Sequence, residues 1–414
     1  MQRREFIRTT AAGSLLPVAL SQAFSRLPDE KNPKVKELRD RIKPVTEGER
    51  LQRQENARKL MAGQGIDALI LEGGTSMSYF SGVSWGRSER LFAMVLPKKG
   101  EAQFVAPKFE EARAREQVGT ATLLTWEEDE SPYALIKDIL AGAGATTGTL
   151  GIEETTRHFV TENISRAMSG ATLASGTPVT AGCRSVKSEH EIELMQIAND
   201  ITATVYKDSL RYLKDGLSER EFGATLTKLF AEFGVSGGAL VLFGEASAHP
   251  HGSVKEHVLH EGQIVLIDGG CTVEGYGSDI TRTTVFGKPT EKMRSVWNIV
   301  RRAQDAGLAA AKPGAPAETI DAAARKVITD AGYGPGYKYF THRLGHGIGM
   351  DGHEWYYLVN GNKRPEAPGN MHSNEPGIYI LGEFGIRLED EMLITGDGAK
   401  LLLPQAESLE TIFP

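Results

Sequence analysis

Four acids and one histidine in the second half of the chain have the types and spacing of metal ligands. Asp268 follows the apolar run 264–267, and Asp279 comes eleven residues later, before another apolar run. If the chain turns at Val273 and Glu274, a hairpin places the two acids opposite each other, with Cβ atoms about 5 Å apart. Like charges in that position destabilise a sheet, so the pair requires a cation or a shared proton.

A second pair of acids repeats this arrangement. Glu375 and Glu389 lie fourteen residues apart and are symmetric about Gly382. His346 lies between the two hairpins in the glycine-rich stretch 345–349, where glycines let the backbone approach closely. Four carboxylates and one imidazole suit two divalent ions of the manganese, cobalt or zinc type. Each residue alone is also explained as a loop, cap or structural residue, but their joint symmetry predicts a dinuclear hydrolytic centre.

Composition excludes several other classes of protein. The 414 residues suffice for two or three domains, and 40% hydrophobic with 24% charged residues is typical of globular proteins. The formal charge of −7 and the lack of a basic block argue against a nucleic-acid partner. Two cysteines, Cys183 and Cys271, are too few for a disulfide scaffold or a thiolate metal site. No apolar run reaches the roughly 18 residues that a membrane span needs.

The elements that position these residues form two expected domains. Short apolar strands alternate with helices over residues 46–180, which predicts an α/β domain that begins with a helix from Thr46 to Gly63. Residues 24–45 are polar and carry three prolines, which predicts an extended lead-in. The stretch 176–187 is predicted to be irregular. A capping box at Ser188 then opens a second domain over residues 188–414. Its expected strands are 239–243, 263–271, 279–286, 377–380 and 386–394.

Residues 1–23 have the pattern of an export signal. Arg3 and Arg4 precede an apolar stretch from Ala11 to Leu20, and small residues near Ala23 form a cleavage site. Paired arginines of this kind resemble the twin-arginine signal. We therefore expect a periplasmic or secreted protein, exported by the twin-arginine route.

Five stretches of the second domain resemble the metallopeptidases of the pita-bread fold, in particular Xaa-Pro dipeptidases (prolidases) and Xaa-Pro aminopeptidases. These stretches are 266–270, 278–283, 342–349, 374–379 and 387–390. The first domain resembles the creatinase-type companion domain more loosely, for example at 79–83. The resemblance implies an α/β N-terminal domain followed by an α+β pita-bread catalytic domain.

The resemblance also implies a role for each metal-binding residue. Asp268 corresponds to the terminal ligand of one metal, and Asp279 and Glu389 correspond to the bridging carboxylates. His346 and Glu375 correspond to ligands of the other metal, and Glu375 also to the group that carries a proton to the leaving nitrogen. The implied cofactor is a pair of divalent ions, with Mn²⁺ expected and Co²⁺ or Zn²⁺ as alternatives.

Three further residues correspond to groups around the metals. His251 matches an outer histidine near the substrate, and His353 matches the histidine that stabilises the tetrahedral intermediate. Arg387 matches an arginine beside the bridging glutamate, with contact to the substrate carboxylate as an expectation. His249 and His342 are predicted to be structural or supporting.

The implied activity is hydrolysis of the Xaa-Pro bond of dipeptides or short peptides by a hydroxide shared between the two ions. Two alternatives stay open: an Xaa-Pro aminopeptidase acting on longer peptides, and a non-catalytic peptide-binding or metal-binding module of the same fold. Tyr356 stands where relatives often have proline, which affects the expected specificity more than the chemistry. A homodimer is implied by the resemblance alone.

Overall fold

The first domain is built on a mixed sheet of short, apolar strands. The computed structural model describes residues 33–413 and places six strands in the order β4-β3-β2-β1-β5-β6. These strands are β1 (Ala68–Glu72), β2 (Ala93–Pro97), β3 (Gln103–Pro107), β4 (Thr122–Trp126), β5 (Thr149–Ile152) and β6 (Thr172–Ser175). The alternation of short apolar strands with helices predicted for residues 46–180 is present.

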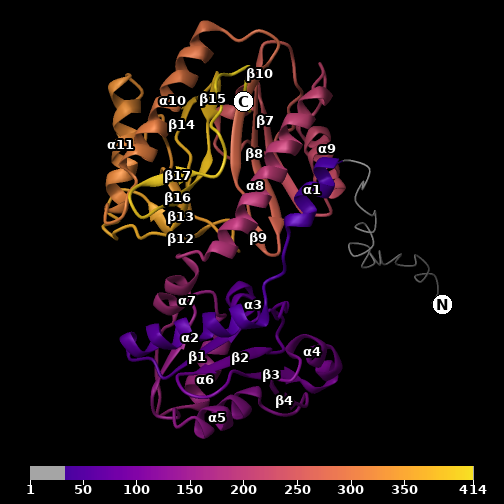
Figure 1. The fold of residues 1–414 in the computed structure, drawn as a ribbon, viewed down its shortest axis with the longest axis vertical. Helices are drawn as coiled ribbons and strands as arrows, with labels where there is room; N and C mark the ends of the chain where they lie inside the picture. The colour runs from indigo at the N-terminus through magenta and orange to yellow at the C-terminus, as the bar shows by residue number, and fades with distance from the viewer. Residues whose placement is uncertain (1–32, 414) are drawn as a thin grey trace, which may run out of the picture.

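Helices cover both faces of this sheet (Figure 1). They are α2 (Glu47–Gln64), α3 (Thr75–Ser81), α4 (Glu111–Val118), α5 (Pro132–Gly142), α6 (His158–Ala167) and α7 (Thr177–Arg184). The capping box predicted at Thr46 is present, and Gly65 ends α2 in the left-handed conformation. Helix α7 lies within the stretch predicted to be irregular, so that prediction was wrong.

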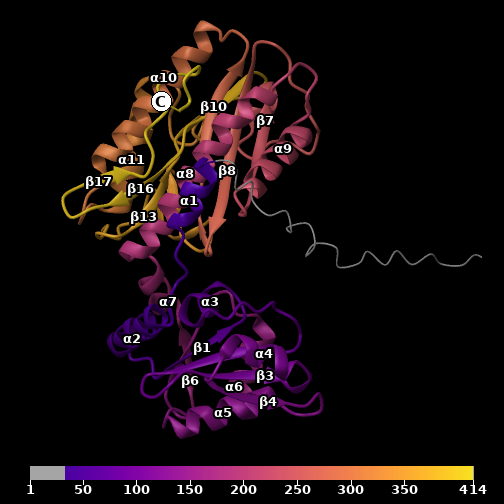
Figure 2. The same ribbon diagram turned by 45° about the vertical axis from the view of Figure 1, so that its right-hand side comes forward.

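The described part of the chain starts on the second domain, at α1, and then crosses to the first. Helix α1 (Pro33–Arg41) packs beside α8 (Glu189–Ser209), as the two ribbon views show (Figures 1 and 2). The guanidinium of Arg41 pairs with Glu193 at 2.9 Å and with Asp200 at 2.6 Å. The predicted extended lead-in is therefore helical over α1, and the part of the lead-in before residue 33 lies outside the described residues.

The second domain contains three sheets. Their strands are β7 (Ser236–Phe243), β8 (Gln263–Val273), β9 (Tyr276–Gly277), β10 (Ile280–Phe286), β11 (Gly345–Gly347), β12 (Glu354–Leu358), β13 (Met371–Asn374), β14 (Gly377–Ile380), β15 (Phe384–Arg387), β16 (Asp390–Ile394) and β17 (Ala399–Leu401). The sheet orders are β10-β8-β7 with β9 attached, β12-β11-β13-β16-β17, and β14-β15. The predicted strand 386–394 is in fact the two strands β15 and β16, interrupted just before Asp390.

Strand β8 is apolar on both faces because helices or strands cover each face. Val265 and Ile267 pack into a core with α8 and α9 (Glu219–Glu232). Ile264 and Leu266 face a second core with α10 (Glu291–Ala310) and α11 (Ala317–Asp330). Alternation along a strand sends successive side chains to opposite faces. Of helices within residues 33–413, none is long and apolar enough to cross a membrane.

The two predicted hairpins form, but the register of one differs. Asp268 of β8 pairs with Thr281 and not with Asp279, so the predicted pairing is wrong by two residues. Asp279 lies just before β10, diagonal to Asp268. In the β14–β15 hairpin, Gly377 pairs with Arg387, which confirms the predicted symmetry about Gly382.

Candidate metal centre

The five predicted metal-binding residues line one cavity of about 420 Å³ in the second domain. Asp268 comes from β8, Asp279 from the residue before β10, and His346 from β11. Glu375 follows β13, and Glu389 precedes β16. Carboxylates and an imidazole from two different sheets therefore meet in one place, although they are spread over more than a hundred residues of sequence.

The donor atoms of these residues form three overlapping groups. Within each group, one oxygen or nitrogen per residue lies within 4.8 Å of the others, and the groups are Asp268–Asp279–Glu389, His346–Glu375–Glu389 and Asp279–His346–His353. His346 Nε2 is 3.3 Å from Glu375 Oε1 and 3.9 Å from Asp279 Oδ2. Because Asp279, His346 and Glu389 each belong to two groups, the donors form one continuous set.

The carboxylates repel one another when no cation lies between them. Burial, together with the charge of Asp268, raises the pKa of Asp279 to about 8. Burial and the charge of Asp279 raise the pKa of Glu389 well above its ordinary value. Keeping several buried carboxylates ionised at such short distances destabilises the folded protein, and divalent cations bound between them offset this repulsion. The donor chemistry therefore fits a pair of divalent ions.

In contrast to the repelling carboxylates, His346 and Glu375 attract each other and each favours the charged form of the other. Burial lowers the pKa of His346, but the hydrogen bond and the charge of Glu375 outweigh it, so the pKa is raised. Burial raises the pKa of Glu375, but His346 and His342 outweigh that effect and lower it to about 2. His346 Nδ1 lies 3.0 Å from the carbonyl oxygen of Gly347. This contact leaves Nε2 directed at the carboxylates.

A buried threonine that the sequence analysis did not single out links two of the carboxylates. The hydroxyl oxygen of Thr281 lies 2.8 Å from Asp268 Oδ1 and 2.6 Å from Glu389 Oε2. It also accepts a 3.1 Å hydrogen bond from Arg387 Nε. Alternation could have identified it, because Thr281 is two residues from Asp279 and shares its face of the chain.

Replacing Thr281 with valine is expected to weaken metal binding by about 10- to 100-fold, as loss of a partner that orients a ligand typically does. The hydroxyl disappears while the volume stays nearly constant. Calorimetric titration of the metal-free protein with Mn²⁺ measures the effect. Thr284→Val is the matched control, because that hydroxyl bonds the carbonyl of Leu409, away from the cavity. Equal Mn²⁺ affinities for the two variants would contradict the role of Thr281.

A second chain of hydrogen bonds holds Arg387 against Asp268. The Nη2 group of Arg387 donates to Asp268 Oδ2 at 2.6 Å, and Nη1 donates to the hydroxyl of Tyr379 at 2.7 Å. Tyr379 lies 2.8 Å from His342 Nε2, and His342 Nδ1 lies 2.8 Å from the carbonyl oxygen of Arg343. Burial lowers the pKa of His342 and so favours the neutral ring. Because a carbonyl oxygen can only accept, Nδ1 of that ring donates to Arg343 and Nε2 accepts from Tyr379. His342 is thus connected to Arg387 through Tyr379.

His251 and His353 lie at the exposed side of the same cavity. The ring of His353 stacks on that of His346, with centroids 3.8 Å apart. The Nη2 group of Arg343 lies 3.3 Å from His353 Nδ1. Since a guanidinium can only donate, Nδ1 accepts and the ring proton is on Nε2.

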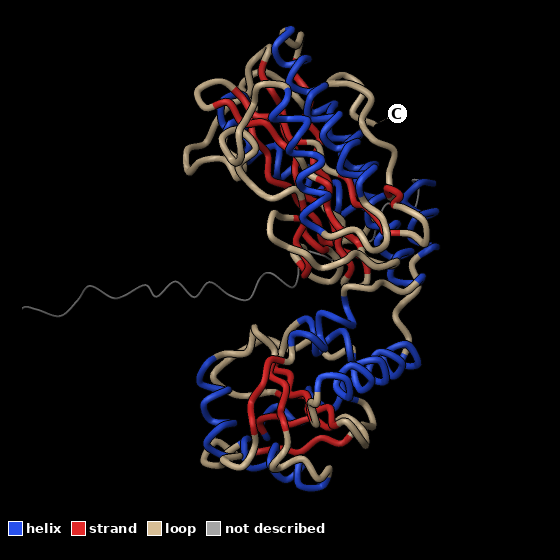
Figure 3. The backbone as a smooth tube through the Cα atoms, turned by 90° about the vertical axis from the view of Figure 1, so that its left-hand side faces the viewer, coloured by secondary structure: helices blue, strands red, loops and turns tan. Residues whose placement is uncertain are grey.

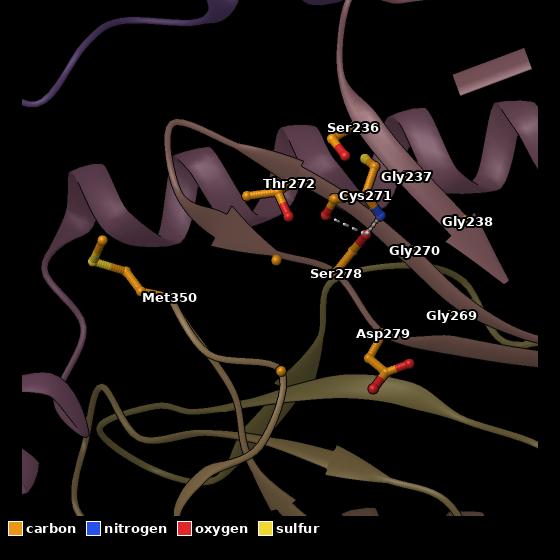
Figure 4. Close-up of a pocket in the computed structure, with 12 residues that line it drawn as sticks. Ser236, Gly237, Gly238, Gly269, Gly270, Cys271, Thr272, Ser278, Asp279 and Met350 are labelled. Carbon is orange, nitrogen blue, oxygen red and sulfur yellow. Dashed lines mark hydrogen bonds between the residues drawn. The ribbon is translucent and has the colours of Figure 1, made fainter. Parts of the chain in front are cut away.

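A second cavity of about 410 Å³ opens beside Asp279 (Figure 4). Glycines of β7 and β8 form much of its wall, and Asp279 also lines the first cavity. In the close-up, Asp279 lies at one end of the cavity, and Ser278 bonds to the backbone of Cys271 (Figure 4). The two cavities therefore meet at a predicted bridging carboxylate.

Comparison with known proteins identifies the class of enzyme. Residues 193–396 match metallopeptidase family M24, and residues 53–186 match the creatinase/prolidase N-terminal domain. An uncharacterized peptidase of Schizosaccharomyces pombe is 40% identical over 350 residues, covering 79% of this chain and 75% of the relative. The chain therefore belongs to metallopeptidase family M24. The predicted two-part fold and the prediction of a metallopeptidase are confirmed.

Solved structures resemble most of the chain, across both domains. A dipeptidase from Pyrococcus horikoshii has a TM-score of 0.77 and 31% identity, covering 84% of this chain and 97% of its own. A dipeptidase from Mycobacterium ulcerans has a TM-score of 0.83 and 29% identity, with coverages of 90% and 100%. An Xaa-Pro dipeptidase from Bacillus anthracis has a TM-score of 0.76 and 29% identity, with coverages of 85% and 97%.

Proposed function

We propose that this metallopeptidase hydrolyses the peptide bond before proline in short Xaa-Pro peptides, using two divalent ions. The observation that carries the proposal is the convergence of four carboxylates and His346 on one cavity as overlapping donor groups. The similarity to an Xaa-Pro dipeptidase over 85% of the chain supports the choice of substrate. Carboxylate-rich donor sets favour Mn²⁺ among the candidate ions.

The proposed holders of the metals are Asp268, Asp279, His346, Glu375 and Glu389. When bound, two such ions lower the pKa of a shared water and polarise the scissile carbonyl. Glu375 is the carboxylate that moves a proton from the attacking water to the proline nitrogen, which has no N–H before cleavage. His353 presents its Nε2 proton to the oxygen that becomes negative. Arg387 and Thr281 hold Asp268 in place.

Hydrolysis of Ala-Pro is expected to depend on added metal. Chelation should remove the activity, and Mn²⁺ should restore it. Ala-Ala is the control substrate, because it has an amide N–H and a free φ at the position that proline restricts. Cleavage of Ala-Pro that survives complete metal removal, or cleavage of Ala-Ala but not Ala-Pro with Mn²⁺ present, would contradict the proposal.

We also propose export by the twin-arginine route to the periplasm or medium. The support is the paired Arg3 and Arg4 followed by an apolar stretch. These residues lie outside the part of the chain that the structure describes. A homodimer is likewise a proposal, which sedimentation of the purified protein would test.

A further inference from the structure

His353 depends on its backbone for its position, because few contacts hold its side chain. Among residues 33–413, its exposed ring makes one hydrogen bond, the 3.3 Å contact with Arg343, and stacks on His346. A group that stabilises a developing negative charge must be held within about 0.5 Å of its productive position. The backbone of the loop 348–353, which connects β11 to β12, therefore has to supply that precision.

The first domain contacts this loop at Asp351, two residues before His353. Thr75, the first residue of α3, donates its hydroxyl proton to Asp351 Oδ1 at 2.6 Å. Arg184, the last residue of α7, donates to Asp351 Oδ2 at 2.6 Å. Two helices of the first domain therefore hold both oxygens of one carboxylate in the loop.

The neighbouring residue of the loop, Met350, lies between the hydrophobic cores of the two domains. Its side chain packs against the first-domain core that contains Leu71 and Phe80. It also packs against the second-domain core that contains Ile267. The loop is therefore both packed and hydrogen-bonded at the domain interface.

A second connection between the loop and the first domain runs through β9. Gly277 of β9 donates its N–H to the carbonyl oxygen of Gly349 in the loop, at 2.8 Å. The adjacent Tyr276 is 1% exposed, and its hydroxyl accepts a 2.8 Å hydrogen bond from Nη2 of Arg53 in α2. The ribbon view shows β9 at the edge of the second domain that faces the first (Figure 1). The first domain thus holds the loop directly at Asp351 and indirectly through β9.

We propose that the first domain positions His353 for catalysis, and that Thr75 and Asp351 are the positioning residues. This inference rests on the proposed function for the role of His353. It gives a task to a domain that contributes none of the five predicted metal-binding residues. Loss of these contacts should displace His353. The predicted metal ligands should stay in place, because contacts within the second domain hold them, such as that from Arg387 to Asp268.

The first test measures Ala-Pro hydrolysis by the Mn²⁺-loaded variants Thr75→Val and Asp351→Ala. Each should lower kcat by about 10-fold, the lower end of the range for loss of a hydrogen bond to a charged group. KM should stay nearly unchanged, because the lost interaction acts in the transition state. Thr75→Ser keeps the hydroxyl and should keep the activity. Calorimetric titration should give both variants the Mn²⁺ affinity of the wild type, and a large loss of that affinity would overturn the proposal.

A double-variant cycle tests whether Thr75 acts through His353. If it does, Thr75→Val should cause no further loss of kcat when His353→Phe is already present, because the two changes remove the same interaction. Equal losses of kcat in the wild-type and His353→Phe backgrounds would overturn the proposal, since Thr75 would then act on another group.

Hydrogen exchange of the Mn²⁺-loaded protein provides a readout that does not require activity. Peptides covering 348–353 should exchange faster in Thr75→Val than in the wild type, because the loop opens locally more often. Thr204→Val is the matched control: its hydroxyl is also half-buried but bonds the carbonyl of Asp200 within α8. Unchanged exchange of the loop in Thr75→Val would overturn the proposal. A wild type that cleaves no Xaa-Pro peptide would instead refute the proposed function, and the exchange comparison would still decide whether the first domain holds the loop.

Discussion

Asp279→Asn is expected to abolish both tight Mn²⁺ binding and Ala-Pro hydrolysis. Asp279 belongs to two of the three donor groups, so it affects both predicted metal positions. An amide oxygen carries no charge and binds divalent ions far more weakly than a carboxylate does. Activity should fall by more than the roughly 100-fold that loss of a supporting partner causes.

Without metal, the Asp279→Asn variant should be no less stable than the wild type. In the metal-free protein the pKa of Asp279 is raised to about 8, so its ionised form is disfavoured by folding. A raised carboxyl pKa means that stability is lost as pH rises from the ordinary value towards 8. Asparagine removes this loss, so metal-free Asp279→Asn should be at least as stable as the metal-free wild type at pH 8.

Thermal unfolding with and without Mn²⁺ distinguishes the two effects. At a free Mn²⁺ concentration 1,000 times Kd, metal binding should raise the free energy of unfolding of the wild type by about 4 kcal/mol. The increase should be far smaller for the variant. Asp305→Asn, which alters an exposed pair with Arg301, is the control and should behave as the wild type. An Asp279→Asn variant that keeps both the Mn²⁺ stabilisation and normal turnover would refute the metal centre.

The hairpin register shows where sequence reasoning succeeded and where it stopped. The apolar run of β8 correctly placed Asp268 at a buried position, but the turn was placed one residue too early. The structure turns at Glu274 and Gly275, both with positive φ, and pairs Val273 with Tyr276. Two-residue turns favour glycine in this position, so Gly275 was the available signal.

The two missed helices have a different cause. The prolines of residues 24–45 were interpreted as an extended lead-in, although Pro33 begins α1 and proline is favoured in the first turn of a helix. Helix α7, in the stretch predicted to be irregular, also has a proline in its first turn. What stabilises α1 is its contact with the second domain, for example from Arg41 to Asp200. These partners are 159 residues apart, and local patterns contain no information about such pairs.

The site shows the same limit at the level of single residues. The acids that converge on the cavity were predictable because a buried carboxylate is unusual in an apolar context. Tyr379 and Arg343 could not be predicted in this way, because their neighbours in the sequence are ordinary. Each contacts the site only through residues that the fold brings close to it. The structure also changed the expectation for Arg387, because only the fold shows that its donors are already used.

The backbone view shows the two domains as two bodies connected by the chain (Figure 3). A buried ion cluster on β12, the strand that follows His353, joins them. Arg184, at the end of α7, donates to Glu354 Oε1 at 2.6 Å, and Lys187 donates to Glu354 Oε2 at 2.9 Å. Each of these three side chains is at most 2% exposed. Arg184 also pairs with Asp351, whose carboxylate accepts from Thr75 of the first domain.

Glu354→Gln is expected to destabilise the protein by about 3–5 kcal/mol, because removal of one partner leaves buried charges uncompensated. Urea unfolding of the Mn²⁺-loaded protein measures the change. Glu383→Gln is the matched control: its pair with Lys292 is about half exposed, so its loss should cost less than about 1 kcal/mol. Similar costs for the two variants would show that the interdomain cluster adds nothing beyond a surface pair.

Acid should reduce the difference between Glu354→Gln and the wild type. Burial raises the pKa of Glu354, but Lys187 and Arg184 outweigh it and lower the pKa below 4.5. A lowered carboxyl pKa contributes stability that is present above the ordinary value and is lost as pH falls through the folded-state pKa. Adding Lys187→Met to Glu354→Gln removes one of the stranded cations and should recover part of the loss near neutral pH. If the double variant is instead less stable than the single one, uncompensated charge is not the cause.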